Sequence, residues 1–363
     1  MQAQGVVARV AGEPAKVEDI VIDDPGPGEV LVRIEASGVC HTDLLYLQGD
    51  VGDAFPYLLG HEGAGIVEKV GPGVTTPAAG DYVILAWRAP CGQCRFCLIG
   101  SPNLCSASLN AQPRMRTSDG QTLTPSLGIG TFCTHTVVAA SQAIPVDRGV
   151  PAAQASLIGC GVMTGIGAAL YTARVRPGST IAVFGCGGVG DSVIQGARIA
   201  GARTIIAIDV APKKLDAARA FGATDVIDAS EGGTVERIKE LTGGNGVDYS
   251  FEAAGRADTL DQALWCRDLA GVCTMIGVPS PTARLNLPLQ RFFGLGGSLR
   301  VSWYGDCLPS RDFPMLCDWY RKGTLDLDSM VTARISLHDT EAAFHAMHDG
   351  VTLRSVIVFD SGQ

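Results

Sequence analysis

Residues 180–190 read TIAVFGCGGVG and decide the fold of the middle of the chain. Thr180 to Phe184 is a short apolar run typical of a buried strand, and residues 185–190 follow it directly in the pattern G-x-G-x-x-G. Glycines in such a loop let the backbone approach a pyrophosphate, and the N-terminus of the next helix favours negative charge. Asp209 ends the next apolar run, where a carboxylate can accept hydrogen bonds from ribose hydroxyls. The motif therefore predicts a dinucleotide site formed by Gly185, Gly187, Gly188, Val189, Gly190 and Asp209.

The same residues favour NAD over NADP. A 2′-phosphate on the ribose would face the Asp209 carboxylate, and Val210 beside it supplies no guanidinium to receive that phosphate.

Strand-like and helix-like segments alternate around this motif. We expect further strands over 204–208, 248–252 and 272–276, and helices over 189–200, 213–221 and 259–264. Such alternation predicts an α/β fold with a doubly wound parallel sheet, which we assign to residues 156–303.

The chain before this domain has a different pattern of residues. Short strands such as 30–36, 65–70 and 81–85 are separated by Gly- and Pro-containing turns, which predicts an irregular, mainly β domain. We expect residues 1–155 and 304–363 to form it together, with helices over 313–322 and 340–348 and a last strand over 355–359.

Composition excludes several classes of function. The chain has 363 residues and a formal charge of −9, with no basic block, which argues against nucleic acid and anionic membranes as partners. We find no apolar run of bilayer length and no signal-peptide pattern at MQAQGVVARV, so we expect a cytoplasmic protein. In a reducing compartment, clustered thiols among the 12 cysteines are read as metal ligands or reactive groups.

Four of these cysteines lie close together in the pattern C-x2-C-x2-C-x7-C. Four thiolates on one loop can close a tetrahedral shell around zinc and leave no open position, which predicts a structural site. An iron–sulfur cluster is the alternative, but its usual run needs a thiol where Ser101 stands before Pro102. The predicted ligands are Cys91, Cys94, Cys97 and Cys105.

A second set of metal-binding residue types is dispersed. Cys40 and His61 lie in the first domain, and Cys160 follows far downstream. Two thiolates and one imidazole would leave a position open for water or substrate, as in catalytic zinc sites. Taken singly, each of these residues is ordinary, and spacing alone does not join Cys160 to the other two.

The run Gly60-His61-Glu62-x2-Gly65-x5-Gly71-x2-Val74 resembles the zinc signature of medium-chain zinc-dependent alcohol dehydrogenases, and the four-cysteine loop resembles that family's structural zinc lobe. The resemblance implies a GroES-like catalytic domain, a Rossmann domain, NAD and two zinc ions per chain. It further implies catalytic zinc on Cys40, His61 and Cys160, with Glu62 beside the metal and Asp43 orienting the His61 ring.

The family pattern also implies roles for other residues. Thr42 would hydrogen-bond the alcohol oxygen and carry its proton outward, whereas Leu45 stands where familiar members have a relay histidine. His41 is the nearest imidazole and would lie near the pyrophosphate. The remaining implied contacts are Lys214 with the adenosine ribose, Arg354 with the pyrophosphate, Val278 with the nicotinamide carboxamide, and Trp87 as a wall of the substrate pocket.

An open zinc site beside NAD implies hydride transfer from an alcohol carbon. Local runs over 86–88, 127–130, 161–163 and 302–309 resemble the mycothiol-dependent formaldehyde dehydrogenases, which act in formaldehyde detoxification on S-(hydroxymethyl)mycothiol. Mycothiol is a neutral, polyhydroxylated thiol, and Arg114, Arg116 and His135 are available as donors to it. The alternatives are a general primary or aromatic alcohol dehydrogenase and, remotely, a non-enzymatic NAD-binding relative. We expect a small-molecule alcohol or thiol adduct as substrate, and a homo-oligomer of two or more chains.

Overall fold

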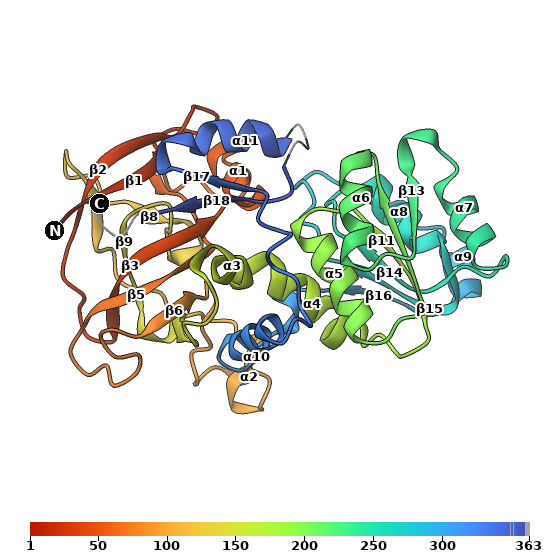
Figure 1. Ribbon diagram of the computed structural model, residues 1–363, viewed down its shortest axis with the longest axis horizontal. Coiled ribbons are helices and arrows are strands. Elements are labelled where there is room, and N and C mark those ends of the chain that lie inside the picture. Colours follow the sequence, from red (N-terminus) through yellow and green to blue (C-terminus); the bar gives the residue numbers. More distant parts are fainter. Residues whose placement is uncertain (349, 351, 360–363) are drawn as a thin grey trace. The chain divides into compact units, whose positions relative to one another are not determined.

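The computed structural model describes residues 1–348, 350 and 352–359, so residues 360–363 of the domain expected over 304–363 lie outside the described residues. The chain divides into two compact units (Figure 1). The first comprises Met1–Cys160 with Leu308–Gln363, and the second Gly161–Cys307. The boundaries expected from the sequence were 155/156 and 303/304.

The first unit is built on two mostly antiparallel sheets of short strands. One has the order β7-β2-β1-β4-β8, and the other β10-β6-β5-β3-β18-β17 with β9 also paired to β3. The strands are β1 (Gln2–Ala8), β2 (Lys16–Ile22), β3 (Glu29–Gly38), β4 (Tyr57–Leu58), β5 (Gly63–Val70), β6 (Tyr82–Leu85), β7 (Met115–Thr117), β8 (Thr124–Pro125), β9 (His135–Ala139), β10 (Ala143–Pro145), β17 (Ala333–Ile335) and β18 (Ser355–Val358). The expected mainly β fold is confirmed.

The first unit also contains α-helices. They are α1 (His41–Gln48), α2 (Arg95–Leu98), α3 (Ala152–Leu157), α10 (Pro309–Arg321) and α11 (Thr340–His348). Helix α1 follows β3 without a long loop, and α3 packs on β3 and β5. Strand β18 returns from the end of the chain to pair with β3, so that Val356 lies opposite Gly38.

The second unit contains one parallel sheet with the order β13-β12-β11-β14-β15-β16. Its strands are β11 (Thr180–Phe184), β12 (Thr204–Asp209), β13 (Asp225–Asp228), β14 (Val247–Glu252), β15 (Arg267–Met275) and β16 (Ser298–Val301). The order reverses at β11, as in doubly wound dinucleotide-binding sheets, so the expected α/β fold is confirmed.

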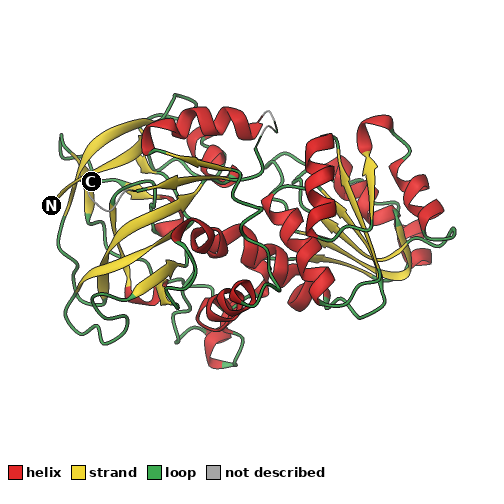
Figure 2. Ribbon diagram, viewed as in Figure 1, coloured by secondary structure: helices red, strands yellow, loops and turns green. Residues whose placement is uncertain are grey.

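Helices lie along the faces of this sheet (Figure 2). They are α5 (Gly188–Ile199), α6 (Pro212–Phe221), α7 (Thr234–Leu241), α8 (Ala257–Trp265) and α9 (Leu289–Leu295), whereas α4 (Met163–Gly167) packs against α5. One core cluster joins Phe184, Ile206 and Ile208 of the strands to Leu260 and Leu264 of α8. Its burial holds the sheet and the helices together.

One helical stretch, Ala152–Ala173, is long and apolar enough by length and composition to cross a membrane. Its most apolar window is 83% buried within the protein, as in the core helix of a globular unit, so it is weak evidence for a membrane span. It includes the π-helical turn Ile158–Val162, which carries Cys160. We did not predict this helix because its glycines, with their low helix propensity, suggest a loop.

Candidate metal centres and dinucleotide site

One group of ligands gathers inside the first unit from three separated segments. Cys40 precedes α1, His61 and Glu62 precede β5, and Cys160 lies in the π-helical turn after α3. One ligand atom from each of the four lies within 4.8 Å of the others. The fold therefore joins Cys160 to Cys40 and His61, which spacing in the sequence could not do.

Asp43 holds the His61 ring. Its Oδ1 lies 2.9 Å from His61 Nδ1 and accepts from the Gly60 amide at 3.1 Å, and its Oδ2 accepts from the Cys40 amide at 3.1 Å. The other ring nitrogen, His61 Nε2, is buried and has no hydrogen-bond partner among the described residues. A buried nitrogen left free in this way, facing two thiols, fits a zinc ligand whose second nitrogen is oriented by a carboxylate.

The two thiols differ in proton affinity. A hydrogen bond from the Cys160 thiol is the main cause that lowers the pKa of Cys40, and the same bond together with burial raises the pKa of Cys160. Both shifts arise from the same contact between the two sulfur atoms, and zinc ligation would hold both sulfurs as thiolates.

Glu62 has a partner that we did not predict. Its Oε2 accepts from Arg354 Nη2 within the first unit, and both side chains are buried. Burial raises the pKa of Glu62 to about 7, although the Arg354 charge opposes that shift. The structure thus places Arg354 beside the metal-ligand cluster, and its contact with a pyrophosphate stays a prediction.

The other predicted residues around this centre lie on or near α1. Thr42 is half-buried and His41 is exposed, both in the first turn, and Leu45 follows one turn later. Trp87 is half-buried after β6 and lines a pocket with Tyr46 of α1. We missed Tyr46, although its position one turn after Thr42 on the same helix is a signal that could have identified it.

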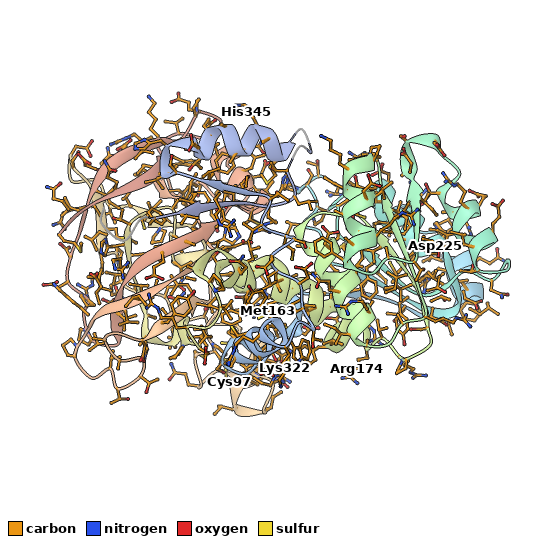
Figure 3. The ribbon with its side chains drawn as sticks, in the orientation of Figure 1. Cys97, Met163, Arg174, Asp225, Lys322 and His345 are labelled. Carbon is orange, nitrogen blue, oxygen red and sulfur yellow. The ribbon has the colours of Figure 1, made fainter. Side chains whose placement is uncertain are left out.

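The second ligand group is the four-cysteine lobe around α2, on which Figure 3 labels Cys97. Ligand atoms of Cys91, Cys94, Cys97 and Cys105 lie within 4.8 Å of one another, and Cys94 Sγ is 3.8 Å from Cys105 Sγ. The Cys91 amide donates to Cys105 Sγ and the Cys94 amide to Cys91 Sγ, each at 3.3 Å. Amide hydrogen bonds also lower the pKa of Cys94 to about 5. Backbone hydrogen bonds lower the pKa of Cys105 as well, whereas burial raises the pKa of Cys97 to about 11. This closed set of four sulfurs fits structural zinc.

The dinucleotide motif occupies the turn between β11 and α5 in the second unit. A Cβ on Gly190 would lie 1.8 Å from the Gly185 carbonyl oxygen, so only glycine fits there. A Cβ on Gly187 would meet no atom within 4 Å, which leaves open space at the N-terminus of α5. This cradle fits a pyrophosphate.

Asp209 and Lys214 lie next to that cradle. Asp209 accepts from the Cys186 amide at 2.8 Å and from the Ala211 amide at 3.0 Å, so its carboxylate is fixed to the glycine-rich loop. Lys214 belongs to the first turn of α6. Val278 is 57% exposed after β15, with its backbone against Gly255.

Comparisons with known proteins agree with this geometry. Residues 26–148 match the alcohol dehydrogenase GroES-like domain family, and residues 188–322 match the zinc-binding dehydrogenase family. The S-(hydroxymethyl)glutathione dehydrogenase of Saccharomyces cerevisiae is 39% identical over 98% of this chain and 95% of its own. That of Synechocystis is 40% identical over 98% of this chain and 100% of its own.

Among solved structures, benzyl alcohol dehydrogenase from Acinetobacter calcoaceticus has a TM-score of 0.92 and 29% identity over 99% of this chain and 100% of its own. Since the relatives match over nearly the full chain and the residues fit zinc and NAD, the chain belongs to the medium-chain zinc-dependent alcohol dehydrogenases and is an NAD-dependent oxidoreductase.

Proposed function

We propose that this dehydrogenase oxidises the S-hydroxymethyl adduct that formaldehyde forms with a neutral, polyhydroxylated thiol such as mycothiol. The observation that carries the proposal is a pocket of 460 Å³ inside the first unit that is lined by Tyr46 of α1 and Trp87 and has no charged side chain in its lining. Relatives named S-(hydroxymethyl)glutathione dehydrogenase support the reaction class.

The pocket begins one helical turn from Thr42, at Tyr46. Its lining residues are Tyr46, Val51, Tyr57, Trp87, Ser108, Asn110, Ala111, Gln112, Pro113, Thr122, Leu123, Thr124, Pro125, Leu127 and Gly128. Hydroxyl and amide groups recur in this set, and no charged side chain belongs to it. Such a lining suits sugar-like hydroxyl groups, whereas the two carboxylates of glutathione would be desolvated there without a cation.

The arginines that we offered as donors are engaged elsewhere. Arg114 Nε donates to Glu29 at 2.7 Å, and Arg116 Nη1 donates to Asp23 at 2.7 Å. His135 Nε2 lies 3.3 Å from Glu68. None of these three side chains lines the pocket. The pocket therefore offers no cation to a glutathione carboxylate, and a neutral thiol fits it better.

We assign the site residues as follows. Cys40, His61 and Cys160 would hold the catalytic zinc, and Asp43 would fix the His61 ring. Bound zinc would act as a Lewis acid that lowers the pKa of an alcohol. Thr42 would accept the alcohol proton through its hydroxyl and pass it outward along α1. Cys91, Cys94, Cys97 and Cys105 would hold the structural zinc.

In the second unit, Asp209 and Lys214 would bind the adenosine ribose, and the amides of Gly187, Gly188 and Val189 would bind the pyrophosphate. The Val278 backbone would hold the carboxamide of the nicotinamide. When NAD is bound, its nicotinamide ring accepts the hydride.

A general aromatic alcohol dehydrogenase is the second candidate. The likeness to benzyl alcohol dehydrogenase and the aromatic residues Tyr46, Tyr57 and Trp87 in the pocket favour it.

Formaldehyde oxidation by the zinc-loaded protein with NAD separates the candidates, when measured alone, with mycothiol, with glutathione, and beside benzyl alcohol without a thiol. We expect the highest kcat/KM with mycothiol. Faster oxidation of benzyl alcohol than of either adduct would favour the second candidate.

Two substitutions of Gln112 test whether the uncharged lining determines the choice of thiol. Gln112→Lys adds a cation to the lining and should raise kcat/KM for the glutathione adduct, whereas the uncharged Gln112→Met should not. Equal effects of the two substitutions on the glutathione adduct would contradict the role of charge.

Self-association is a further part of the proposal. Strand β16 pairs with β15 on one side and, among the described residues, with no strand on the other. Its side chains Leu299 and Val301 are 37% and 58% exposed, and Phe293 on α9 is 88% exposed. Because an open apolar strand edge pairs readily with another strand, a second copy of the chain is the partner that fits it.

A further inference from the structure

A buried carboxyl group lies directly behind the glycine-rich cradle and has no assigned role. Asp191 is the fourth residue of α5, one position after Gly190, and it is 1% exposed. Neither of its carboxylate oxygens has a hydrogen-bond partner among the described residues. An apolar residue would cost less here, because a buried carboxyl without donors is destabilising.

The charges around Asp191 belong to the dinucleotide site. Asp209 at the end of β12 and Lys214 on α6 both act on it, and the Cys186 thiol lies close enough for the Asp191 charge to affect it. Among the other elements packed against α5, α4 (MTGIG) and β11 (TIAVF) contain no titratable side chain. The remaining titratable side chains on these elements are Tyr171 on the helical turn Ala168–Ala173, Lys213, Asp216 and Arg219 on α6, and Asp248, Tyr249 and Glu252 on β14. Asp209 is itself fixed by the Cys186 amide, so Asp191, the loop and Asp209 form one cluster.

Burial is the main cause that raises the pKa of Asp191 well above its usual value, and repulsion from Asp209 adds to that shift. Lys214 opposes the shift. In its neutral form Asp191 places no charge behind the N-terminus of α5.

We propose that Asp191 is a positioning residue for the dinucleotide, and that NAD binds to the form of the protein in which the Asp191 carboxyl carries a proton. An ionised Asp191 would add a second negative charge beside Asp209, close to where the cradle receives the pyrophosphate. It would also attract the Lys214 ammonium inward, away from the ribose. Loss of the proton therefore weakens NAD binding, and binding is linked to proton uptake at high pH.

The test measures binding rather than turnover. Dissociation constants of NADH and of ADP-ribose are determined between pH 6 and 10 for the zinc-loaded wild type, Asp191→Asn and Asp191→Leu. ADP-ribose carries the adenosine ribose and the pyrophosphate but no nicotinamide, so it reports on the cradle without the ring that approaches the metal. Asp216→Asn, which removes an exposed carboxylate from α6, is the matched control.

We expect wild-type affinity for both ligands to fall about fivefold or more across this range, with a limit of tenfold per pH unit. Asp191→Asn and Asp191→Leu should lose this pH dependence of the affinity for ADP-ribose, and Asp216→Asn should keep it. Calorimetry in two buffers of different ionisation enthalpy should show proton uptake at the alkaline end for wild type and none for Asp191→Asn.

A flat wild-type profile overturns the proposal. So do parallel slopes in wild type and Asp191→Asn, because a uniform loss of affinity would mean that the side chain is merely structural. Neither result depends on the substrate, so the outcome is independent of whether mycothiol is used.

Discussion

The Thr42 hydroxyl lies in the first turn of α1, between the proposed metal ligand Cys40 and the Asp43 carboxylate that holds His61. If it accepts the alcohol proton, Thr42→Ala should lower kcat by about 10²- to 10⁴-fold, the usual range for a lost proton-transfer group. Thr42→Ser keeps a hydroxyl and should retain most activity. Single-turnover formation of NADH measures the step directly.

Zinc content and NADH affinity are the controls for Thr42, and both should be unchanged in the two variants. Comparable rates for Thr42→Ala and wild type would assign the proton transfer to another group.

Asp209 is a residue-scale determinant of cofactor choice. Both of its oxygens are already oriented by backbone amides of Cys186 and Ala211. Charge-assisted hydrogen bonds of this kind contribute about 1.5–3 kcal/mol, so Asp209→Ala should weaken NAD about tenfold or more. The same change should narrow the preference for NAD over NADP in steady-state kinetics, and an unaltered preference would refute the assignment.

At the scale of elements, Glu29 joins the start of β3 to two neighbouring segments. Its carboxylate accepts from the Gly26 amide, the Gln112 amide and Arg114 Nε, each at 2.7 Å. Burial opposes ionisation, but these three donors outweigh it and lower the pKa of Glu29. A lowered folded-state pKa stabilises the fold above the ordinary value of 4.5, and this contribution is lost as the pH falls through the folded-state value.

Glu29→Gln should therefore destabilise the protein by about 2 kcal/mol near neutral pH, and by progressively less as the pH falls below about 4.5. Urea unfolding of wild type and variant between pH 3 and 7 measures the difference. Asp24→Asn removes an exposed carboxylate that pairs with Lys69 at 2.7 Å, and it measures how much a surface ion pair near the same turn contributes. A difference that does not change with pH would exclude ionisation as its cause.

The fold of the four-cysteine lobe around α2 should depend on its bound zinc. No side chain of α2 itself is buried, so sulfur ligation rather than apolar packing must order this helix. Cys94→Ser should lower the zinc content from two ions per chain to one and reduce the melting temperature. Elemental analysis with differential scanning calorimetry tests both, and iron with acid-labile sulfide in the wild type would contradict the zinc assignment.

At the scale of the whole molecule, assembly should depend on the free edge of β16. A lysine blocks strand pairing because its charge would be desolvated, so Val301→Lys should reduce the sedimenting mass to that of one chain. Leu241→Lys places the same charge on an exposed position of α7 and should leave assembly intact. A single-chain mass for the wild type, or no effect of Val301→Lys, would exclude this edge as the interface.

The parts that sequence could predict are those whose geometry is local. The turn after β11 and the four-cysteine lobe each form within one short segment, so their spacing specifies them. The cluster of Cys40, His61 and Cys160 depends on how β3, β5 and the turn after α3 come together, and only the family resemblance joined them. The partnership of Glu62 with Arg354 was missed because β18 brings those distant residues together.

The route of the chain through the first unit bears on how the protein is made. All seven cysteine and histidine ligands proposed for zinc have been synthesised once Cys160 appears, yet β3 still lacks β18 (Ser355–Val358). The second unit, complete at Cys307, can fold on the ribosome while the first still waits for its last strand. Ribosome-stalled chains long enough to bring Cys307 out of the exit tunnel, but not β18, should therefore protect the second unit from protease before the first, reversing the usual N-to-C order of folding.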